Sequence, residues 1–146
     1  MADVHNKEQR SRNMAAIRGR DTKPELIVRR LVHRLGYRFR LHRRDLPGRP
    51  DLVLPRHRVV IFVHGCFWHQ HDCRYGRVVP ATRAEFWKNK RDENAARDVR
   101  NLSALRSDGW RVAIIWECWT RDVIDLETRL RSFLSRKKKS VEASSV

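Results

Sequence analysis

Two cysteines and a histidine lie close together near the middle of the chain, and a third cysteine follows far downstream. Cys66, His71 and Cys73 stand within eight residues of one another, and Cys118 is the remaining cysteine of the sequence. Two thiolates and an imidazole from one segment, closed by a distant thiolate, form the ligand set of a tetrahedral structural zinc site. We therefore expect this segment to fold as a loop that a metal ion ties to another element through Cys118.

Two further histidines, His64 and His69, lie in the same segment. In an extended loop the side chains of His69, His71 and Cys73 point to the same side, so the pattern alone leaves open which histidine binds the metal. A histidine that binds no metal is able to transfer protons near neutral pH. The alternative is a set of buried cysteines with a packed histidine, but these residues stand too densely for ordinary core positions.

Positive charge dominates the composition. The sequence holds 33 Lys and Arg residues against 17 Asp and Glu residues, which gives a formal net charge of +16. Such a field attracts polyanions, and nucleic acid is the first partner to consider, with an anionic membrane surface second. A charge excess that serves only solubility is the alternative, but it would mix the two signs more evenly.

The sequence shows no sign of export or membrane insertion. Residues 1–7 contain no apolar signal region, and no apolar run approaches the roughly 20 residues that a membrane helix needs. We therefore expect a cytosolic protein, in which three cysteines favour metal binding over disulfides.

The length of 146 residues is typical of a single domain. Residues 1–20 are polar and rich in arginine, so we expect a flexible arm that contacts DNA phosphates. Residues 137–146 begin with lysines and end in small polar groups, so we expect a disordered tail. The folded domain is then expected over residues 21–136.

Hydrophobic periodicity predicts an α/β domain. Thr22 and Glu25 have the spacing of a capping box at the start of a helix that Gly36 ends. The order of all expected elements predicts a mixed β-sheet with helices on both faces. After the first helix these elements are an alternating strand over 37–42, a short strand over 51–54, a buried central strand over 59–63, a long polar helix over 83–107, a second central strand over 112–116 and an amphipathic helix over 126–134.

Polar residues stand at one end of the predicted sheet. Asp51 opens one strand and His64 follows the next, so pairing of these strands would bring their side chains together. Magnesium prefers hard oxygen ligands, which Asp51 supplies through its carboxylate and Val63 through its backbone carbonyl. A neutral imidazole nearby is able to take a proton from an attacking water. A turn aspartate and a satisfied strand-end histidine are the simpler alternatives.

Six short motifs follow one another along the chain: RSRNMAAI (10–17), LPGRPD (46–51), FVHGCFWH (62–69), PATR (80–83), EFW (85–87) and WEC (116–118). In this order they resemble the motifs of the very short patch repair endonucleases. The resemblance implies a restriction-endonuclease-like three-layer fold with a structural zinc site. It implies a magnesium-dependent nick in one strand of duplex DNA, beside the thymine of a T·G mismatch left by deamination of 5-methylcytosine. It also implies a functional link to a cytosine-5 DNA methyltransferase, and we expect a monomer that works in the cytoplasm at the nucleoid.

The resemblance also implies roles for residues of the active site and the zinc site. The magnesium ligands are Asp51 and Val63, the general base is His69, and His64 and Glu25 complete the active site. The structural zinc ligands are Cys66, His71, Cys73 and Cys118. For Glu25, however, the capping box is a complete structural explanation in its own right.

Aromatic and apolar residues match those that enter the DNA. Phe67, Trp68 and Trp87 correspond to a wedge between base pairs at the mismatch, and Met14 and Ile17 to an arm in the opposite, minor groove. Such a wedge costs about a few kcal/mol of unstacking per base step, and a weakened T·G pair lowers that cost. The alternatives are core packing for the aromatic residues and amphipathic helix packing for Met14 and Ile17.

The sequence departs from the family and its fold relatives at two places. Fold relatives carry an acidic-x-Lys pair after the aspartate, whereas the matching stretch here is Phe62-Val63-His64, so we expect histidine to take part of the lysine's work. Some members have threonine where this chain has Val63. A ligand that is a backbone carbonyl would survive that change.

Two other function classes stay open from the residues alone. One is a zinc-stabilised DNA-binding module without catalysis, which a magnesium-dependent nick in mismatched duplex would exclude. The other is a hydrolase with catalytic zinc, which needs an open coordination position that four protein ligands close.

Overall fold

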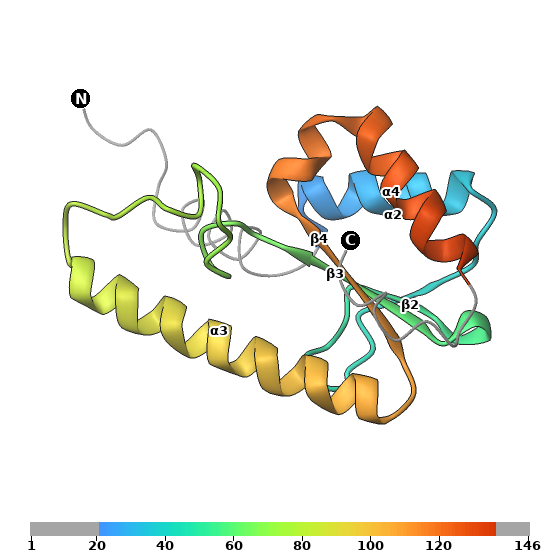
Figure 1. The fold of residues 1–146 in the computed structure, drawn as a ribbon, viewed down its shortest axis with the longest axis horizontal. Coiled ribbons are helices and arrows are strands. Elements are labelled where there is room, and N and C mark those ends of the chain that lie inside the picture. Colours follow the sequence, from blue (N-terminus) through green and yellow to red (C-terminus); the bar gives the residue numbers. More distant parts are fainter. Residues whose placement is uncertain (1–20, 137–146) are drawn as a thin grey trace, which may run out of the picture.

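The computed structural model describes residues 21–136 as a β-sheet that lies between helices (Figure 1). The predicted order of helix, three strands, helix, strand and helix is confirmed. Met14 and Ile17, the predicted arm over 1–20 and the predicted tail over 137–146 lie outside the described residues. The elements are α2 (Lys23–Arg34), β1 (Arg40–Leu41), β2 (Leu52–Leu54), η1 (Pro55–His57), β3 (Val59–His64), α3 (Ala84–Ser107), β4 (Arg111–Trp116), η2 (Glu117–Arg121) and α4 (Val123–Ser135).

The sheet is mixed and its strands follow one another in the order β1-β2-β3-β4. β1 and β2 pair antiparallel, as do β2 and β3, whereas β3 and β4 pair parallel. The parallel register sets His64 opposite Trp116, so β3 and β4 end at the same edge of the sheet. The segments that follow these two strands therefore start side by side.

A hydrophobic core lies on each face of the sheet. Along β3, Val59 and Ile61 pack into one core, whereas Val60 and Phe62 pack into the other. The first core is closed by α2 and α4, and the second by α3, which lies along the opposite side of the sheet in Figure 1. Burial of both faces explains why the central strands are continuous apolar runs rather than alternating ones.

The N-terminus of α2 follows the predicted cap only in part. Thr22 is the N-cap, and its side chain accepts a hydrogen bond of 3.4 Å from the backbone N–H of Glu25. The Glu25 carboxylate does not return to the N-cap backbone but accepts from the N–H of Asp21 at 3.1 Å. Glu25 therefore does not complete the reciprocal capping box, and its carboxylate is able to make contacts outside the helix cap.

The strand expected over residues 37–42 is much shorter in the structure. Arg40 and Leu41 alone pair with β2, while Tyr37 and Phe39 pack against the core beside the sheet. The partner strand β2 has three residues between Pro50 and Pro55, and proline cannot donate to a strand ladder. A short partner therefore limits β1.

α3 is unusual because most of its surface faces solvent. Leu105 is the buried residue of this 24-residue helix, whose other residues are mostly polar or charged but include exposed apolar ones such as Phe86 and Val99. Among the helices of residues 21–136, none combines the length and apolar content that would let it cross a membrane.

Leu130→Ala should destabilise the domain, because this α4 side chain is fully buried in the first core. We expect the free energy of unfolding to fall by about 2–5 kcal/mol in urea titrations followed by circular dichroism. Ile124→Ala on the same helix is the control, since Ile124 is 82% exposed and should change stability by less than about 0.5 kcal/mol. Equal losses in the two variants would contradict this packing of α4.

Candidate functional site

Parallel pairing of β3 with β4 brings two distant cysteines together. His64 and Trp116 are register partners, and Cys66 and Cys118 each follow two residues later. The backbone N–H of Cys118 donates to the sulfur of Cys66 at 3.4 Å. The contact follows from the sheet topology and needs no adjustment of either strand.

The loop after β3 adds the other two members of a metal-binding cluster. His71 Nδ1 lies 3.5 Å from the sulfur of Cys118, and the sulfur of Cys73 accepts from the N–H of Gly76 at 3.4 Å. Ligand atoms of Cys66, His71, Cys73 and Cys118 all lie within 4.8 Å of one another. Zinc–ligand bonds of 2.0–2.3 Å in a tetrahedron separate neighbouring ligand atoms by about 3.5–3.8 Å, so this set fits a four-coordinate ion. The structure thus places His71, and not His69, beside the cysteines.

Backbone geometry shapes this loop tightly. The N–H of His71 donates to the carbonyl of Cys66 at 3.0 Å, and the residue between His69 and His71, Gln70, has a positive φ of 54°. A Cβ at Gly76 would lie 1.8 Å from the carbonyl oxygen of His71, so only glycine fits there. Burial raises the pKa of the Cys66 thiol to about 12, and a bound divalent cation would oppose that effect by stabilising the thiolate.

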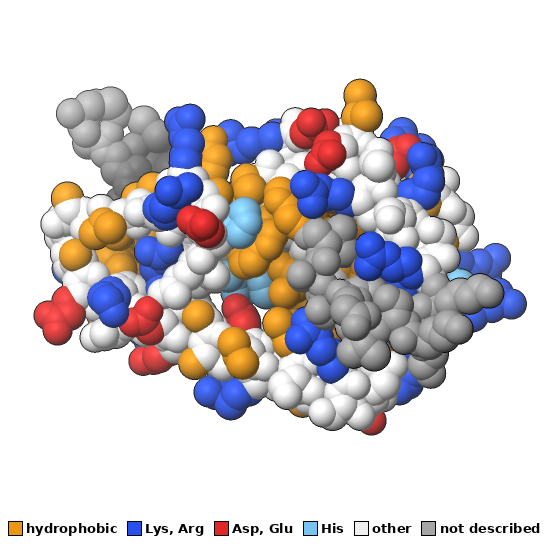
Figure 2. All heavy atoms as spheres, in the orientation of Figure 1, with side chains coloured by type: hydrophobic (Ala, Val, Ile, Leu, Met, Phe, Trp, Pro, Cys, Tyr) orange, Lys and Arg blue, Asp and Glu red, His pale blue; other side chains and the backbone are white. Residues whose placement is uncertain are grey.

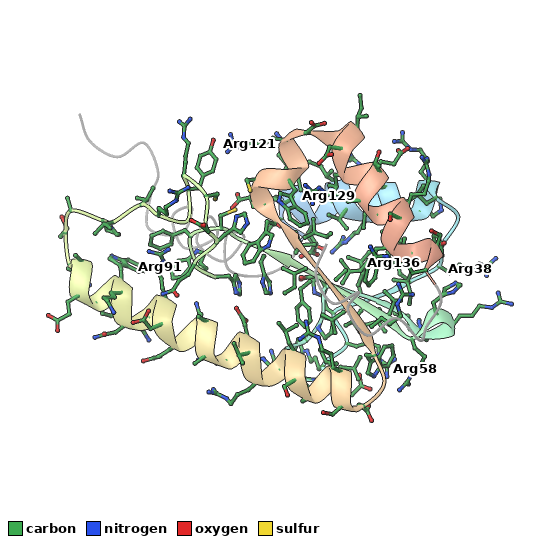
Figure 3. The ribbon with its side chains drawn as sticks, in the orientation of Figure 1. Arg38, Arg58, Arg91, Arg121, Arg129 and Arg136 are labelled. Atoms are coloured by element: carbon green, nitrogen blue, oxygen red, sulfur yellow. The ribbon has the colours of Figure 1, made fainter. Side chains whose placement is uncertain are left out.

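Arg91 fastens the loop to α3. Its side chain extends from the helix towards the loop (Figure 3), where Nε donates to the carbonyl of Phe67 at 2.6 Å and Nη2 to that of Gly76. The guanidinium also lies 4.4 Å from the centre of the Phe67 ring. The sequence analysis missed this residue, because one arginine among 33 lysines and arginines carries no signal.

A large cavity adjoins the metal-binding cluster and has a volume of about 1130 Å³. Figure 2 shows histidine side chains on this face, between hydrophobic side chains and with lysine and arginine side chains nearby. All described residues that were predicted for catalysis, magnesium binding or DNA wedging line this one cavity. They are Glu25, Asp51, Val63, His64, Phe67, Trp68, His69 and Trp87.

Asp51 lies just before β2, next to the C-terminal end of β3. Its Oδ2 accepts a 2.7 Å hydrogen bond from the N–H of Val63. Burial raises the pKa of Asp51 to about 7; the Val63 hydrogen bond opposes this rise and the neighbouring Glu25 carboxylate adds to it. A divalent cation would relieve the repulsion between these two neighbouring carboxylates and would find oxygen ligands in both, so Asp51 and Glu25 fit a magnesium ion.

Glu25 and His42 line the cavity beside Asp51, and Arg29 contacts both of them. The sequence analysis missed His42 and Arg29. Glu25 is 2% exposed, and its Oε2 lies 2.9 Å from Nε2 of His42 and accepts a hydrogen bond from Arg29. Nδ1 of His42 lies 3.9 Å from Oδ1 of Asp51. Glu25 therefore serves both α2 and the cavity, which the capping pattern alone did not reveal.

His69 is held by a carboxylate from α3. Its Nδ1 lies 2.5 Å from Oδ2 of Asp98, and its ring stacks on that of His64 with centroids 3.7 Å apart. Burial, followed by the charge of His69, lowers the pKa of His64 to about 3, so His64 stays neutral in the physiological range. Asp98 was missed because α3 carries several acidic residues and the sequence does not show which one faces the loop.

The predicted wedge residues form one aromatic cluster at the border of the cavity. Trp68 makes edge-to-face contacts with Phe67 and with Trp87, each at a centroid distance of 5.4 Å. Phe86, which the sequence analysis did not single out, lies 5.2 Å from Trp87 and is 37% exposed. The three predicted residues are partly exposed, and neither sheet core includes them.

The cavity thus combines groups that suit phosphodiester chemistry. The carboxylates of Asp51 and Glu25, which are able to hold a divalent cation, line it together with the His69 imidazole, which the Asp98 carboxylate orients. Cationic side chains that suit phosphates line it too, namely Lys23, Arg44, Arg49 and Lys90.

Asp51→Asn should stabilise the domain at high pH in the absence of added divalent cations. The folded-state pKa of Asp51 lies above the unfolded value of about 3.9, so the folded protein binds this proton more tightly than the unfolded chain does. The stability that protonated Asp51 contributes is therefore complete below pH 4 and is lost as pH rises to about 7. Asparagine cannot ionise, so we expect the variant to be more stable than the wild type by about 1–3 kcal/mol at pH 8 and nearly equal at pH 4. Urea titrations at both pH values measure this, with the exposed Asp125→Asn as control. A pH-independent difference would contradict the raised pKa.

Known proteins resemble the chain along most of its length. Residues 2–75 match the family described as DNA mismatch endonuclease Vsr. The chain is 51% identical over 134 residues to the type II nicking enzyme V.XorIIP of Xanthomonas oryzae pv. oryzae, which covers 92% of this chain and 98% of that protein. It is 53% identical over 121 residues to the DNA mismatch endonuclease Vsr of Escherichia coli K12, covering 83% of this chain and 77% of that protein.

A more distant relative is the type II nicking enzyme V.NaeI of Lentzea aerocolonigenes, 40% identical over 113 residues, covering 74% of this chain and 67% of that protein. These matches confirm the resemblance drawn from the six motifs. The chain therefore belongs to the Vsr family of DNA mismatch endonucleases.

Proposed function

We propose that this endonuclease nicks one strand of duplex DNA beside the thymine of a T·G mismatch, by magnesium-dependent hydrolysis. The observation that carries the proposal is that Asp51 and His69 line the same cavity as the aromatic cluster. The names of the relatives support it, since one is a DNA mismatch endonuclease and others are nicking enzymes.

Asp51 and the backbone carbonyl of Val63 would hold the magnesium ion. Magnesium bound there would supply Lewis-acid stabilisation of the negative charge on the phosphate. The Val63 N–H fixes one oxygen of Asp51, which sets the orientation of the carboxylate. Since Val63 contributes only its backbone, the change from threonine leaves this function intact.

His69 acts as the general base in this proposal. Its Nδ1–H donates to Asp98, so the lone pair of the neutral ring is on Nε2 and is available to accept a proton from the attacking water. His64 has a pKa too low to take that proton near pH 7 and instead supports the His69 ring by stacking. Asp98 stabilises the imidazolium that forms.

Zinc is proposed for the metal-binding cluster, with a structural role. Four protein ligands close the coordination sphere, which leaves no position for a substrate. Two thiolates and an imidazole of the loop would be tied to Cys118, and the loop carries both His69 and the aromatic residues. The ion would therefore preorganise the base and the wedge.

Phe67, Trp68 and Trp87 are proposed to wedge into the duplex at the mismatch. Their partial exposure at the border of the cavity would let base pairs stack on them, and a wobble pair costs less to open than a good pair. Met14 and Ile17 are proposed to enter the minor groove from an arm over 1–20.

The wider setting is also proposed from family membership. The endonuclease domain over 21–136 would have the restriction-endonuclease-like fold, with which the mixed sheet between helices agrees. The protein would work as a monomer in the cytoplasm, at the nucleoid, together with a cytosine-5 DNA methyltransferase.

Labelled duplexes, matched and T·G-mismatched, incubated with the protein and magnesium test the activity. We expect a single nick beside the mismatched thymine and none in the matched duplex. Asp51→Asn should lower the nicking rate by at least about 100-fold, because the metal ligand contributes several kcal/mol, while mismatch binding persists. Asp125→Asn is the control. Normal nicking by Asp51→Asn would refute the magnesium assignment, and equal cutting of both duplexes would refute the mismatch specificity.

Asp98→Asn should lower kcat for nicking by about 10²–10⁴-fold, because His69 loses the carboxylate that orients it and stabilises its protonated form. Binding to mismatched DNA, measured by fluorescence anisotropy, should not change. Glu93→Gln removes an exposed carboxylate from the same helix and serves as the control. An unaltered kcat in Asp98→Asn would remove this pair from the mechanism.

A further inference from the structure

The Arg91 side chain of α3 points at the loop that follows β3 (Figure 3). Its Nε donates to the carbonyl of Phe67 at 2.6 Å, its Nη1 to that of Val78 at 3.3 Å, and its Nη2 to that of Gly76. Each nitrogen of the guanidinium therefore donates to a backbone carbonyl. Because Phe67 lies near the start of this loop and Val78 near its end, one side chain holds both parts of the loop against the helix.

The same guanidinium lies over the Phe67 ring. Its central carbon is 4.4 Å from the ring centre, which is the distance of a cation–π contact. Trp87 stands four residues before Arg91 on α3, so the two side chains share one face of the helix. The Trp87 ring lies 6.1 Å from the Phe67 ring at an angle of 69°. Both the backbone and the ring of Phe67 are thus held from one helix.

These contacts differ from those of an arginine that binds DNA. An arginine that recognises phosphate directs its fork of N–H groups at the anion. The Arg91 side chain is half-buried, and each nitrogen of its fork already has a carbonyl acceptor in the loop. Its position therefore suits a structural task at Phe67 better than a contact with the duplex.

We propose that Arg91 is a positioning residue for the Phe67 wedge, which it holds at the angle of entry into the duplex, and that it binds no DNA phosphate. The inference rests on the proposed role of Phe67 as a wedge and adds the group that orients it. Without the guanidinium, the Phe67 carbonyl would lose a donor and the ring would be free to occupy other rotamers. A ring that is not held in advance loses freedom on insertion, so it would open the mismatch less effectively.

2-Aminopurine placed beside a T·G mismatch reports the wedge, since its fluorescence rises when the base loses its stacking partner. Arg91→Met keeps the aliphatic stem and removes the fork, so at saturating protein without magnesium we expect it to lose at least about half of the rise that the wild type produces. Arg100→Met removes the same charge from an exposed position of the same helix and should keep the full rise. A full rise in Arg91→Met would overturn the proposal.

Arg91→Lys separates positioning from charge. Lysine keeps the positive charge but has one nitrogen in place of three, so it cannot reach the carbonyls of Phe67, Gly76 and Val78 together. We expect its fluorescence rise to be as low as that of Arg91→Met. A full rise in Arg91→Lys would mean that charge alone suffices, and the proposal would be wrong. Should Arg91→Met fail to fold, as circular dichroism would show, Arg91→Lys decides.

The salt dependence of DNA binding tests the second half of the proposal. Loss of one phosphate contact lowers the slope of log K against log salt concentration by about 0.9. Arg91→Met should leave the slope for a matched duplex unchanged, whereas Arg44→Met, which removes an exposed cation that lines the cavity, should lower it. A slope lowered by about 0.9 in Arg91→Met would overturn the proposal.

The preference for mismatched DNA gives a further readout. The ratio of the Kd values for matched and T·G-mismatched duplexes should fall by about 10-fold in Arg91→Met, the order expected for one partly buried cation–π contact. An unchanged ratio would contradict the role of Arg91 at the wedge.

Failure of the proposed function would look different. If the wild type itself gave no fluorescence rise on the T·G duplex, the wedge would be refuted and the inference with it. If the wild type and Arg91→Met gave equal rises, the wedge would stand and the role of Arg91 alone would be refuted.

Discussion

The parallel pairing of β3 with β4 is the contact on which the candidate site depends. It ends both strands at one edge of the sheet, so Cys66 and Cys118 meet although they are far apart in the chain. β2 pairs with the other side of β3 and brings Asp51 to the N–H of Val63. One central strand thus positions the metal-binding cluster at its end and the acidic side of the cavity along its flank.

Charge is distributed very unevenly in this molecule. Lysines and arginines outnumber acidic residues almost two to one, yet the cavity gathers Glu25, Asp51 and Asp98. The basic exterior would attract a polyanion to the protein. The carboxylates in the cavity would repel its phosphates unless a bound cation offset their charge, so the reacting phosphate would lie beside that cation. Arg29 and Arg91 show that some of the arginines serve the interior, one among carboxylates and the other on loop carbonyls.

Patterns of apolar residues predicted the elements well, because burial of both sheet faces leaves continuous runs that few other structures tolerate. The cysteine spacing likewise indicated the cluster but left His69 and His71 open; the family resemblance favoured His71, and the fold places it beside the cysteines. Asp98, His42, Arg29 and Arg91 were not predictable. They are polar residues of helices or turns, and the sequence does not separate a polar residue that faces the site from one that faces water. The partners of Asp98, His42 and Arg91 are distant in the chain, whereas Arg29 pairs with Glu25 on its own helix. β1 was overestimated because its length is set by its partner strand, not by its own alternation.

In the proposed mechanism the metal-binding cluster acts by holding the loop that presents His69 to the cavity, and not through the chemistry of its ligands. Nicking of a T·G duplex by His71→Ala and His71→Cys, each with its zinc content measured, tests this most directly. Four thiolates also form a structural zinc site, so His71→Cys should retain one zinc per chain and nick within about 10-fold of the wild type. His71→Ala should lose zinc and nick at least about 100-fold more slowly. Wild-type nicking by a zinc-free His71→Ala protein would contradict the account.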